Sequence, residues 1–176
     1  MKGRGLVLVL GGLAQQVGLS LWLGGILIVG AAVAPAAFRT LPTRSMAGEV
    51  VGACLRGFNT VTLVAAALLL LGLAVDWLNR RRTTWERTLE LVRFLCTAIA
   101  LGITLFLMTS LMPRMDALRQ ASAMGPQFDA MHHTYTTFTY LQLALLLAVA
   151  TLSAQLSLPK AIPASTAVGS GPPLRA

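Results

Sequence analysis

Charged residues are scarce in this sequence. Asp, Glu, Lys and Arg make up 11% of the 176 residues, whereas 56% of the residues are hydrophobic. An ordinary soluble domain has about a quarter charged residues. Four long apolar runs account for the imbalance, and each approaches or exceeds the roughly 20 residues that cross a bilayer. The composition predicts one membrane domain and excludes a separate soluble domain, because the loops are too short to hold a core.

Residues that build common catalytic and metal sites are also few. The chain has two Cys and two His, and Cys54 and Cys96 are isolated in different apolar runs. A disulfide framework is therefore not expected. No zinc spacing, nucleotide-binding loop or nucleophile–base–acid arrangement is visible. These absences favour a protein that is not an enzyme.

Basic residues outnumber acidic ones, 14 Lys and Arg against 6 Asp and Glu, and the net charge is +8. The basic residues cluster beside the ends of the apolar runs, where they determine topology and contact anionic lipid. We predict such a lipid contact at Arg80–Arg82. Nucleic-acid binding is excluded as a function, because no soluble basic face exists to carry it.

The apolar runs predict an all-α integral membrane protein with a bundle of four transmembrane helices. The expected helices cover about 5–34, 58–78, 91–112 and 128–156 within a domain 1–158, and the tail 159–176, rich in Pro, Ala, Ser and Gly, is expected to be disordered. Of the polar residues in the first helix, Gln15, Gln16 and Ser20 are expected to face the bundle.

Local patterns suggest where these helices begin and end. Pro35 is expected to kink or end the first helix, and Pro113 to end the third and open a polar loop. The segment 43–57 predicts a short interfacial helix or the beginning of the second helix. The residues Thr83-Thr84-Trp85-Glu86 predict a capping box before the third helix.

The distribution of basic residues predicts the orientation in the cell membrane. One side holds nine of the 14 basic residues and the other side holds five. By the positive-inside rule both termini are expected in the cytoplasm. A proline at the end of both the first and third runs also suggests two helical hairpins repeated in parallel.

On the opposite side of the membrane, called here the outer face, several polar and aromatic residues should meet. They form the predicted outer-face cluster: Pro35, Phe38, Arg39, Arg114, Phe128, His132 and Tyr135. The two histidines of the chain, His132 and His133, stand at the beginning of the last apolar run.

Methionines near the histidines suggest an alternative metal site. Met108, Met112 and Met115 share one helical face, and thioether with imidazole suits Cu(I). Because adjacent side chains on a helix diverge by about 100°, His132 and His133 cannot easily form one site without a further ligand. The other interpretation is that these methionines are flexible apolar filler.

Several of these residues carry a family resemblance. Trp22-Leu23-Gly24-Gly25, then Ala34-Pro35-x-x-Phe38-Arg39, and later Phe128-x-x-x-His132-x-x-Tyr135 resemble the transmembrane-protein-205-like family, also called domain of unknown function 4149. The resemblance implies a four-helix membrane protein without an established activity. In that family's pattern an asparagine often follows the histidine by one or two turns, where this chain has Thr139. The architecture is more remotely similar to copper-resistance protein D and to HemJ-type protoporphyrinogen oxidases.

These patterns together favour a non-enzymatic membrane protein, such as a transport or stress-related accessory. Its outer-face cluster would bind a partner, lipid or ion. The alternatives are a copper- or haem-binding protein that uses His132 and nearby methionines, and a membrane oxidoreductase that uses such a cofactor. The small residues inside the helices also allow a homo-oligomer.

Overall fold

The computed structural model describes residues 2–80, 82–121 and 125–157, so the predicted tail lies outside the described residues. Every element within these ranges is a helix. Four continuous segments are long and apolar enough to cross a membrane: Gly3–Thr40, Arg44–Asn79, Thr84–Gln120 and Pro126–Ser157. At a rise of about 1.5 Å per residue they are all longer than the about 30 Å of a hydrocarbon core. The predicted four-helix membrane fold is therefore confirmed.

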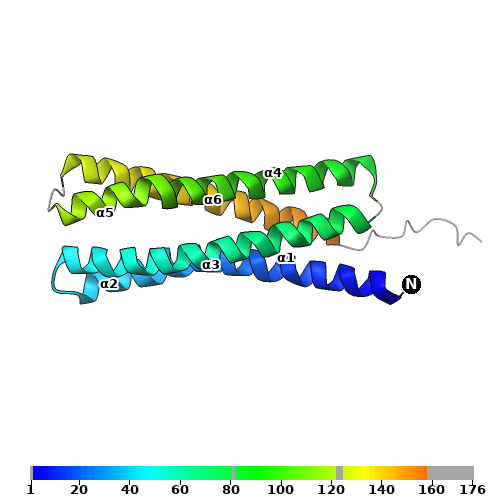
Figure 1. The fold of residues 1–176 in the computed structure, drawn as a ribbon, viewed down its shortest axis with the longest axis horizontal. Coiled ribbons are helices and arrows are strands. Elements are labelled where there is room, and N and C mark those ends of the chain that lie inside the picture. Colours follow the sequence, from blue (N-terminus) through cyan, green and yellow to red (C-terminus); the bar gives the residue numbers. More distant parts are fainter. Residues whose placement is uncertain (1, 81, 122–124, 158–176) are drawn as a thin grey trace, which may run out of the picture.

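The helices form two antiparallel pairs (Figure 1). In one pair α1 (Lys2–Ile28) packs along α3 (Arg44–Asn79), and in the other α4 (Thr84–Phe106) packs along α6 (Pro126–Ser157). We call the end with the N-terminus and the α3–α4 connection the basic end. The opposite end, with α2 (Ala34–Thr40) and α5 (Met112–Gln120), is the proline end. The two pairs lie close together toward the basic end and diverge toward the proline end (Figure 1).

Neither proline ends its helix, so the predicted end at Pro113 is wrong, as is one of the two effects predicted for Pro35, whose other predicted effect was a kink. Each is the second residue of a short α-helix that directly follows a π-helical segment, η1 (Val29–Val33) or η2 (Leu107–Leu111). Proline has no amide hydrogen and its ring clashes with the carbonyl four residues earlier. The wider π-turn relieves this clash, so the helix continues past the proline. The same order of π-segment and proline in both pairs agrees with the predicted hairpin repeat.

Two other expected boundaries change. Of the two interpretations of segment 43–57, the separate interfacial helix is wrong and the beginning of the second helix is confirmed, because α3 runs without a break from Arg44. The Thr43 hydroxyl caps α3 and accepts a hydrogen bond from the Met46 amide at 3.2 Å. The polar loop expected after Pro113 is largely α5. The capping box before α4 is confirmed: the Thr83 hydroxyl accepts from the Glu86 amide, and the Glu86 carboxylate accepts from the Thr83 amide.

Close packing of α1 against α3 depends on glycine. A Cβ added to Gly18 would lie 2.5 Å from the carbonyl oxygen of Ala65, and one added to Gly72 would lie 2.4 Å from that of Gly11. Such contacts let two backbones approach directly. Beside this seam the Trp22 side chain is fully buried among apolar residues of the other helices.

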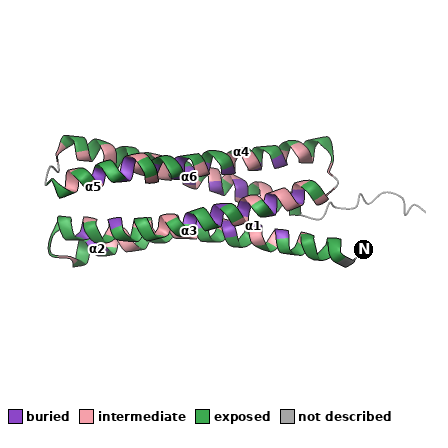
Figure 2. Cartoon of the chain, in the orientation of Figure 1, coloured by how far each residue is buried: buried purple, intermediate pink, exposed green. Residues whose placement is uncertain are grey.

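Buried residues gather where the helix pairs face each other, and most of the outer surface is exposed and apolar (Figure 2). In a bilayer that surface faces lipid tails. Of the three polar residues expected to face the bundle, only Gln15 is buried, while Gln16 and Ser20 are exposed. The prediction for these two is therefore wrong. Neighbouring residues on a helix point about 100° apart, so Gln15 can face the bundle while Gln16 faces outward.

Candidate ligand-binding cavity

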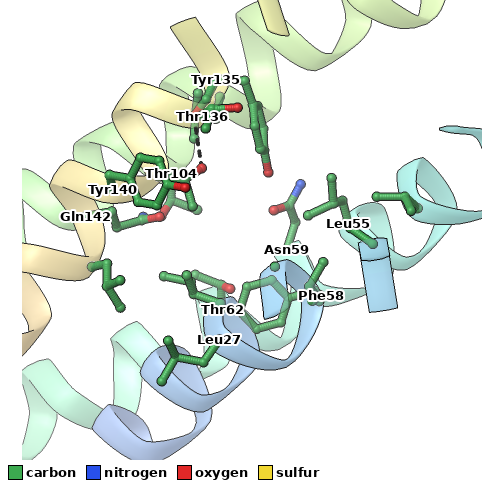
Figure 3. Close-up of a pocket in the computed structure, with 18 of the residues that line it drawn as sticks. Leu27, Leu55, Phe58, Asn59, Thr62, Thr104, Tyr135, Thr136, Tyr140 and Gln142 are labelled. Carbon is green, nitrogen blue, oxygen red and sulfur yellow. Dashed lines mark hydrogen bonds between the residues drawn. The ribbon is translucent and has the colours of Figure 1, made fainter. Parts of the chain in front are cut away.

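The divergence of the two helix pairs leaves a cavity of about 520 Å³ between them. Figure 3 shows that side chains from several helices point into this space. One helix pair lines the cavity with α1, η1, α2 and α3, and the other pair lines it with α4, η2 and α6. A volume of this size lies within the about 300–1,000 Å³ of small-molecule sites.

The deepest polar residues of the cavity lie near the middle of their helices. Thr62 is central in α3, Gln142 is central in α6, and Thr104 is central in the segment Thr84–Gln120. Each of these segments is long and apolar enough to cross a bilayer, so in a membrane the three side chains would lie within the hydrocarbon region. Polar groups at this depth are costly unless they are paired or serve a site.

Gln142 and Thr104 satisfy each other. The Gln142 amide nitrogen donates to the backbone oxygen of Ala100 at 3.0 Å and to the Thr104 hydroxyl at 2.5 Å. The Thr104 hydroxyl in turn donates to the same backbone oxygen at 3.1 Å. Both amide hydrogens of Gln142 are thus used, and its side-chain oxygen accepts no hydrogen bond from the residues the structure describes.

Thr62 behaves differently from the other buried threonines. Thr97 and Thr104 donate to the carbonyl oxygen four residues earlier in their own helix, at 2.8 and 3.1 Å. The Thr62 hydroxyl, in a residue that is 2% exposed, has no hydrogen-bond partner in the described part of the chain. A buried hydroxyl without a partner is rare in proteins. Since Thr62 lines the cavity, a ligand is the natural partner for this hydroxyl.

The cavity opens sideways between α1 and α6. Leu27 and Tyr140 both line it and are 47% and 68% exposed. Gly30 also lines the cavity, and a Cβ added there would meet no atom within 4 Å. In a bilayer this mouth faces the lipid rather than bulk water.

Three residues of the predicted outer-face cluster come together on α6 beside the cavity. The rings of Phe128 and His132 stack with their centroids 6.3 Å apart and 4° between their planes. His132 and Tyr135 line the cavity, and Phe128 packs on an apolar cluster that includes Leu111. His133 is exposed and is not among the lining residues. Of the two histidines, His132 is therefore the one that meets the cavity.

The other predicted cluster residues lie apart from these three. Phe38 is 52% exposed, and the Arg39 side chain donates to the backbone oxygen of Pro35 at 3.1 Å. Arg114 is exposed on α5. Pro35 contributes indirectly, because the π-segment that it requires forms part of the cavity wall. The structure thus brings together only part of the predicted cluster.

Copper or haem binding stays a prediction, and the methionines suggested as ligands have other neighbours in the described part of the chain. The Met112 sulfur accepts a hydrogen bond from the Asn59 amide nitrogen at 3.1 Å, and Met115 is buried in the apolar cluster of Leu111. Met108 is half-buried on η2. Within the described ranges no group of three His, Cys, Asp or Glu side chains could hold a metal. We derive no chemistry from such a cofactor.

The basic end holds a buried ionic network. Glu90 is 2% exposed and Arg93 is 1% exposed. The Glu90 carboxylate pairs with Arg82 at 3.1 Å and with Arg87 at 3.6 Å, and Arg93 donates to the side chain of Gln15. The charges therefore tie helices together, whereas the sequence suggested only a basic flank outside the membrane.

The anionic-lipid contact at Arg80–Arg82 stays a prediction. Arg80 pairs with Asp76 at 3.0 Å, as its spacing predicted, and Arg82 pairs with Glu90 at 3.1 Å. Both guanidinium groups thus already have a carboxylate partner. Arg81 lies outside the described residues.

Sequence analysis did not find the cavity's polar residues Asn59, Thr62, Thr104 and Gln142. Asn59 stands at the beginning of an apolar run and the other three lie within one, and polar residues at such positions often mark a binding site in membrane proteins. That pattern was available in the sequence. The pattern alone does not distinguish side chains that pair within the bundle from side chains that face a cavity.

The fold and this cavity define a multi-pass, four-helix membrane protein with a hollow that opens to the lipid. A family model described as Domain of unknown function (DUF4149) matches residues 17–123, and the chain belongs to this family. The match confirms the resemblance seen in the sequence, although it ends before α6 and so does not cover His132 and Tyr135. No curated protein and no solved structure matches the chain. The remote similarity to copper-resistance protein D and to HemJ-type proteins stays a prediction.

Proposed function

We propose that this protein binds a small lipid-soluble molecule, which it takes up from the bilayer through the mouth between α1 and α6. The observation that carries the proposal is the cavity of about 520 Å³, with unpaired hydrogen-bonding capacity near the bilayer midplane. It would serve in transport or sequestration rather than in catalysis. His132 and Tyr135 of the predicted outer-face cluster form the end of the cavity nearest the proline end.

The lining supports this kind of ligand. Apolar residues such as Ile26, Leu55 and Phe58 make up most of the wall, and a few polar side chains are placed among them. This is the usual composition of a small-molecule site. A molecule dissolved in lipid reaches the mouth by lateral diffusion and does not have to cross the headgroup region.

Photocrosslinking tests the proposal. The purified protein is reconstituted in liposomes with a long-chain alkyl probe that carries a diazirine, and mass spectrometry locates the labelled peptides. We expect labelling of α6 residues 135–143, on the cavity wall. Labelling spread evenly over the lipid-facing surface would contradict the proposal.

A matched pair of glycine variants sharpens this test. Gly30 and Gly24 both have open space around an added Cβ, but only Gly30 lines the cavity. We expect Gly30→Leu to block the mouth and to reduce cavity labelling strongly, while Gly24→Leu leaves it unchanged. Equal labelling of the two variants would also contradict the proposal.

We further propose that the protein lies in the cell membrane with both termini in the cytoplasm. The excess of basic residues on the side of the termini supports this orientation. Association of several copies also stays a prediction, based on small residues within the helices.

A further inference from the structure

Among the residues that the structure describes, the cavity wall contains no charged side chain. Its lining residues include no Asp, Glu, Lys or Arg, and the titratable side chains among them are His132, Tyr135 and Tyr140. The nearest networks of charge are already paired: Arg56 with Asp116 at 3.1 Å toward the proline end, and Glu90 with Arg82 at 3.1 Å at the basic end. A charged headgroup inside the cavity would therefore lose its hydration without gaining a counter-ion, which is costly at this depth.

Two hydrogen-bonding atoms near the middle of their helices are available to a neutral headgroup. Thr62 on α3 has a hydroxyl with no partner among the described residues, and it can donate or accept. Gln142 on α6 has used both amide hydrogens, so its free side-chain oxygen can only accept. Figure 3 shows both side chains at the cavity, reaching it from different helices.

This pair fits a group that can accept one hydrogen bond and donate another. A hydroxyl does both: its oxygen accepts from Thr62 while its hydrogen goes to the Gln142 oxygen. An ether or ester can only accept, and a carboxylate carries the charge that the wall does not compensate. On the basis of the proposed function, we infer that the ligand is a neutral alcohol with a hydrocarbon body. Its hydroxyl lies between Thr62 and Gln142, and its chain passes out between Leu27 and Tyr140 toward the lipid.

The depth of the two residues supports this assignment. Both lie at the middle of helices that are long and apolar enough to cross a membrane, far from either helix end. In this position a single hydrogen bond cannot be replaced by solvent, so its loss should show directly in binding.

The test compares three diazirine probes with the same alkyl chain: a primary alcohol, its methyl ether and the corresponding carboxylate. Each is reconstituted in liposomes with the protein, and labelling of residues 135–143 is measured by mass spectrometry. We expect the alcohol to label most strongly, the ether about fivefold less for the lost donor, and the carboxylate least. Equal labelling by all three probes, or strongest labelling by the carboxylate, would overturn the inference.

Threonine variants isolate the contribution of the Thr62 hydroxyl. Thr62→Val keeps the shape and removes the hydroxyl, and we expect about fivefold weaker labelling by the alcohol. Thr62→Ser should restore it. The control is Thr97→Val, which changes a buried threonine outside the cavity lining and should leave labelling unchanged.

The outcomes separate the two proposals. If none of the three probes labels the cavity, or Gly30→Leu has no effect, the proposed function fails. If Gly30→Leu blocks labelling but Thr62→Val does not alter it, the cavity binds lipid-soluble molecules and the assignment of an alcohol is wrong.

Discussion

The Arg93 guanidinium group on α4 donates a hydrogen bond to the side-chain oxygen of Gln15 on α1, and both side chains are buried. The Gln15 amide nitrogen donates in turn to the backbone oxygen of Gly72 on α3, at 2.8 Å. A single glutamine thus connects three helices within the membrane at the basic end. This connection holds the two helix pairs together opposite the cavity, where they diverge.

Gln15→Leu should destabilise the fold because it leaves the Arg93 guanidinium group without this acceptor in a buried position. We expect a loss of about 2 kcal/mol in the free energy of unfolding, measured by denaturation in detergent micelles. The adjacent Gln16 is exposed and provides a matched control, since Gln16→Leu places an apolar side chain toward lipid. If both variants lowered stability equally, the connection through Gln15 would contribute nothing specific.

Glu90→Gln should be more harmful than a similar change in an exposed ion pair. Glu90 is buried and pairs with the largely buried Arg82 and the half-exposed Arg87, so neutralising it leaves the Arg82 charge without its main partner, at a cost of about 3 kcal/mol. Asp116 pairs with Arg56 and Arg119 on a more exposed surface, and Asp116→Asn should cost less than about 1 kcal/mol. Denaturation curves of the two variants, recorded side by side, check the order. The reverse order would mean that the Glu90 network is not a main contributor to stability.

Gly18→Ala should separate α1 from α3. The added Cβ would lie 2.5 Å from the Ala65 carbonyl oxygen and 2.7 Å from the Leu69 amide nitrogen, both of them backbone atoms that cannot rotate away. We expect a loss of about 2 kcal/mol in unfolding free energy from this overpacking. Gly24→Ala, with no atom within 4 Å of the new Cβ, should instead be neutral or slightly stabilising through its higher helix propensity. Thermal unfolding of both variants distinguishes these effects, and a tolerated Gly18→Ala would contradict the close approach.

The long apolar runs were enough to predict four membrane helices, and the Thr83–Glu86 pattern was enough to predict the start of α4. The expectation that Pro113 ends its helix, and that Pro35 could do so, was wrong, because a local rule says that the ring disfavours an α-turn but not that a π-turn can absorb it. The start of α3 was placed late, since polar residues after Thr43 looked like the end of the membrane rather than the extension of a helix beyond it.

Of the residues that line the cavity, only His132 and Tyr135, at the end nearest the proline end, were predicted from the sequence as site residues. His132 and Tyr135 were found because unusual residue types stand out at the beginning of a run. Thr62 and Gln142 were missed because their importance depends on pairing: two of the three buried threonines bond back to their own helix, and only tertiary structure distinguishes the third. The role of Arg93 was missed for a similar reason, since its partner Gln15 is distant in sequence.

Labelling of single cysteines should determine the orientation. In a variant with Cys54 and Cys96 replaced by Ala, we would place one cysteine at Ser45, near the proline end, or at Trp85, near the basic end; both positions are exposed. The excess of basic residues near the termini predicts that the basic end faces the cytoplasm. A membrane-impermeant maleimide added to intact cells should therefore label Ser45→Cys, and should label Trp85→Cys only after the membrane is permeabilised. Labelling of Trp85→Cys alone in intact cells would show the opposite orientation. The proline end, with the part of the cavity nearest His132, would then face the cytoplasm.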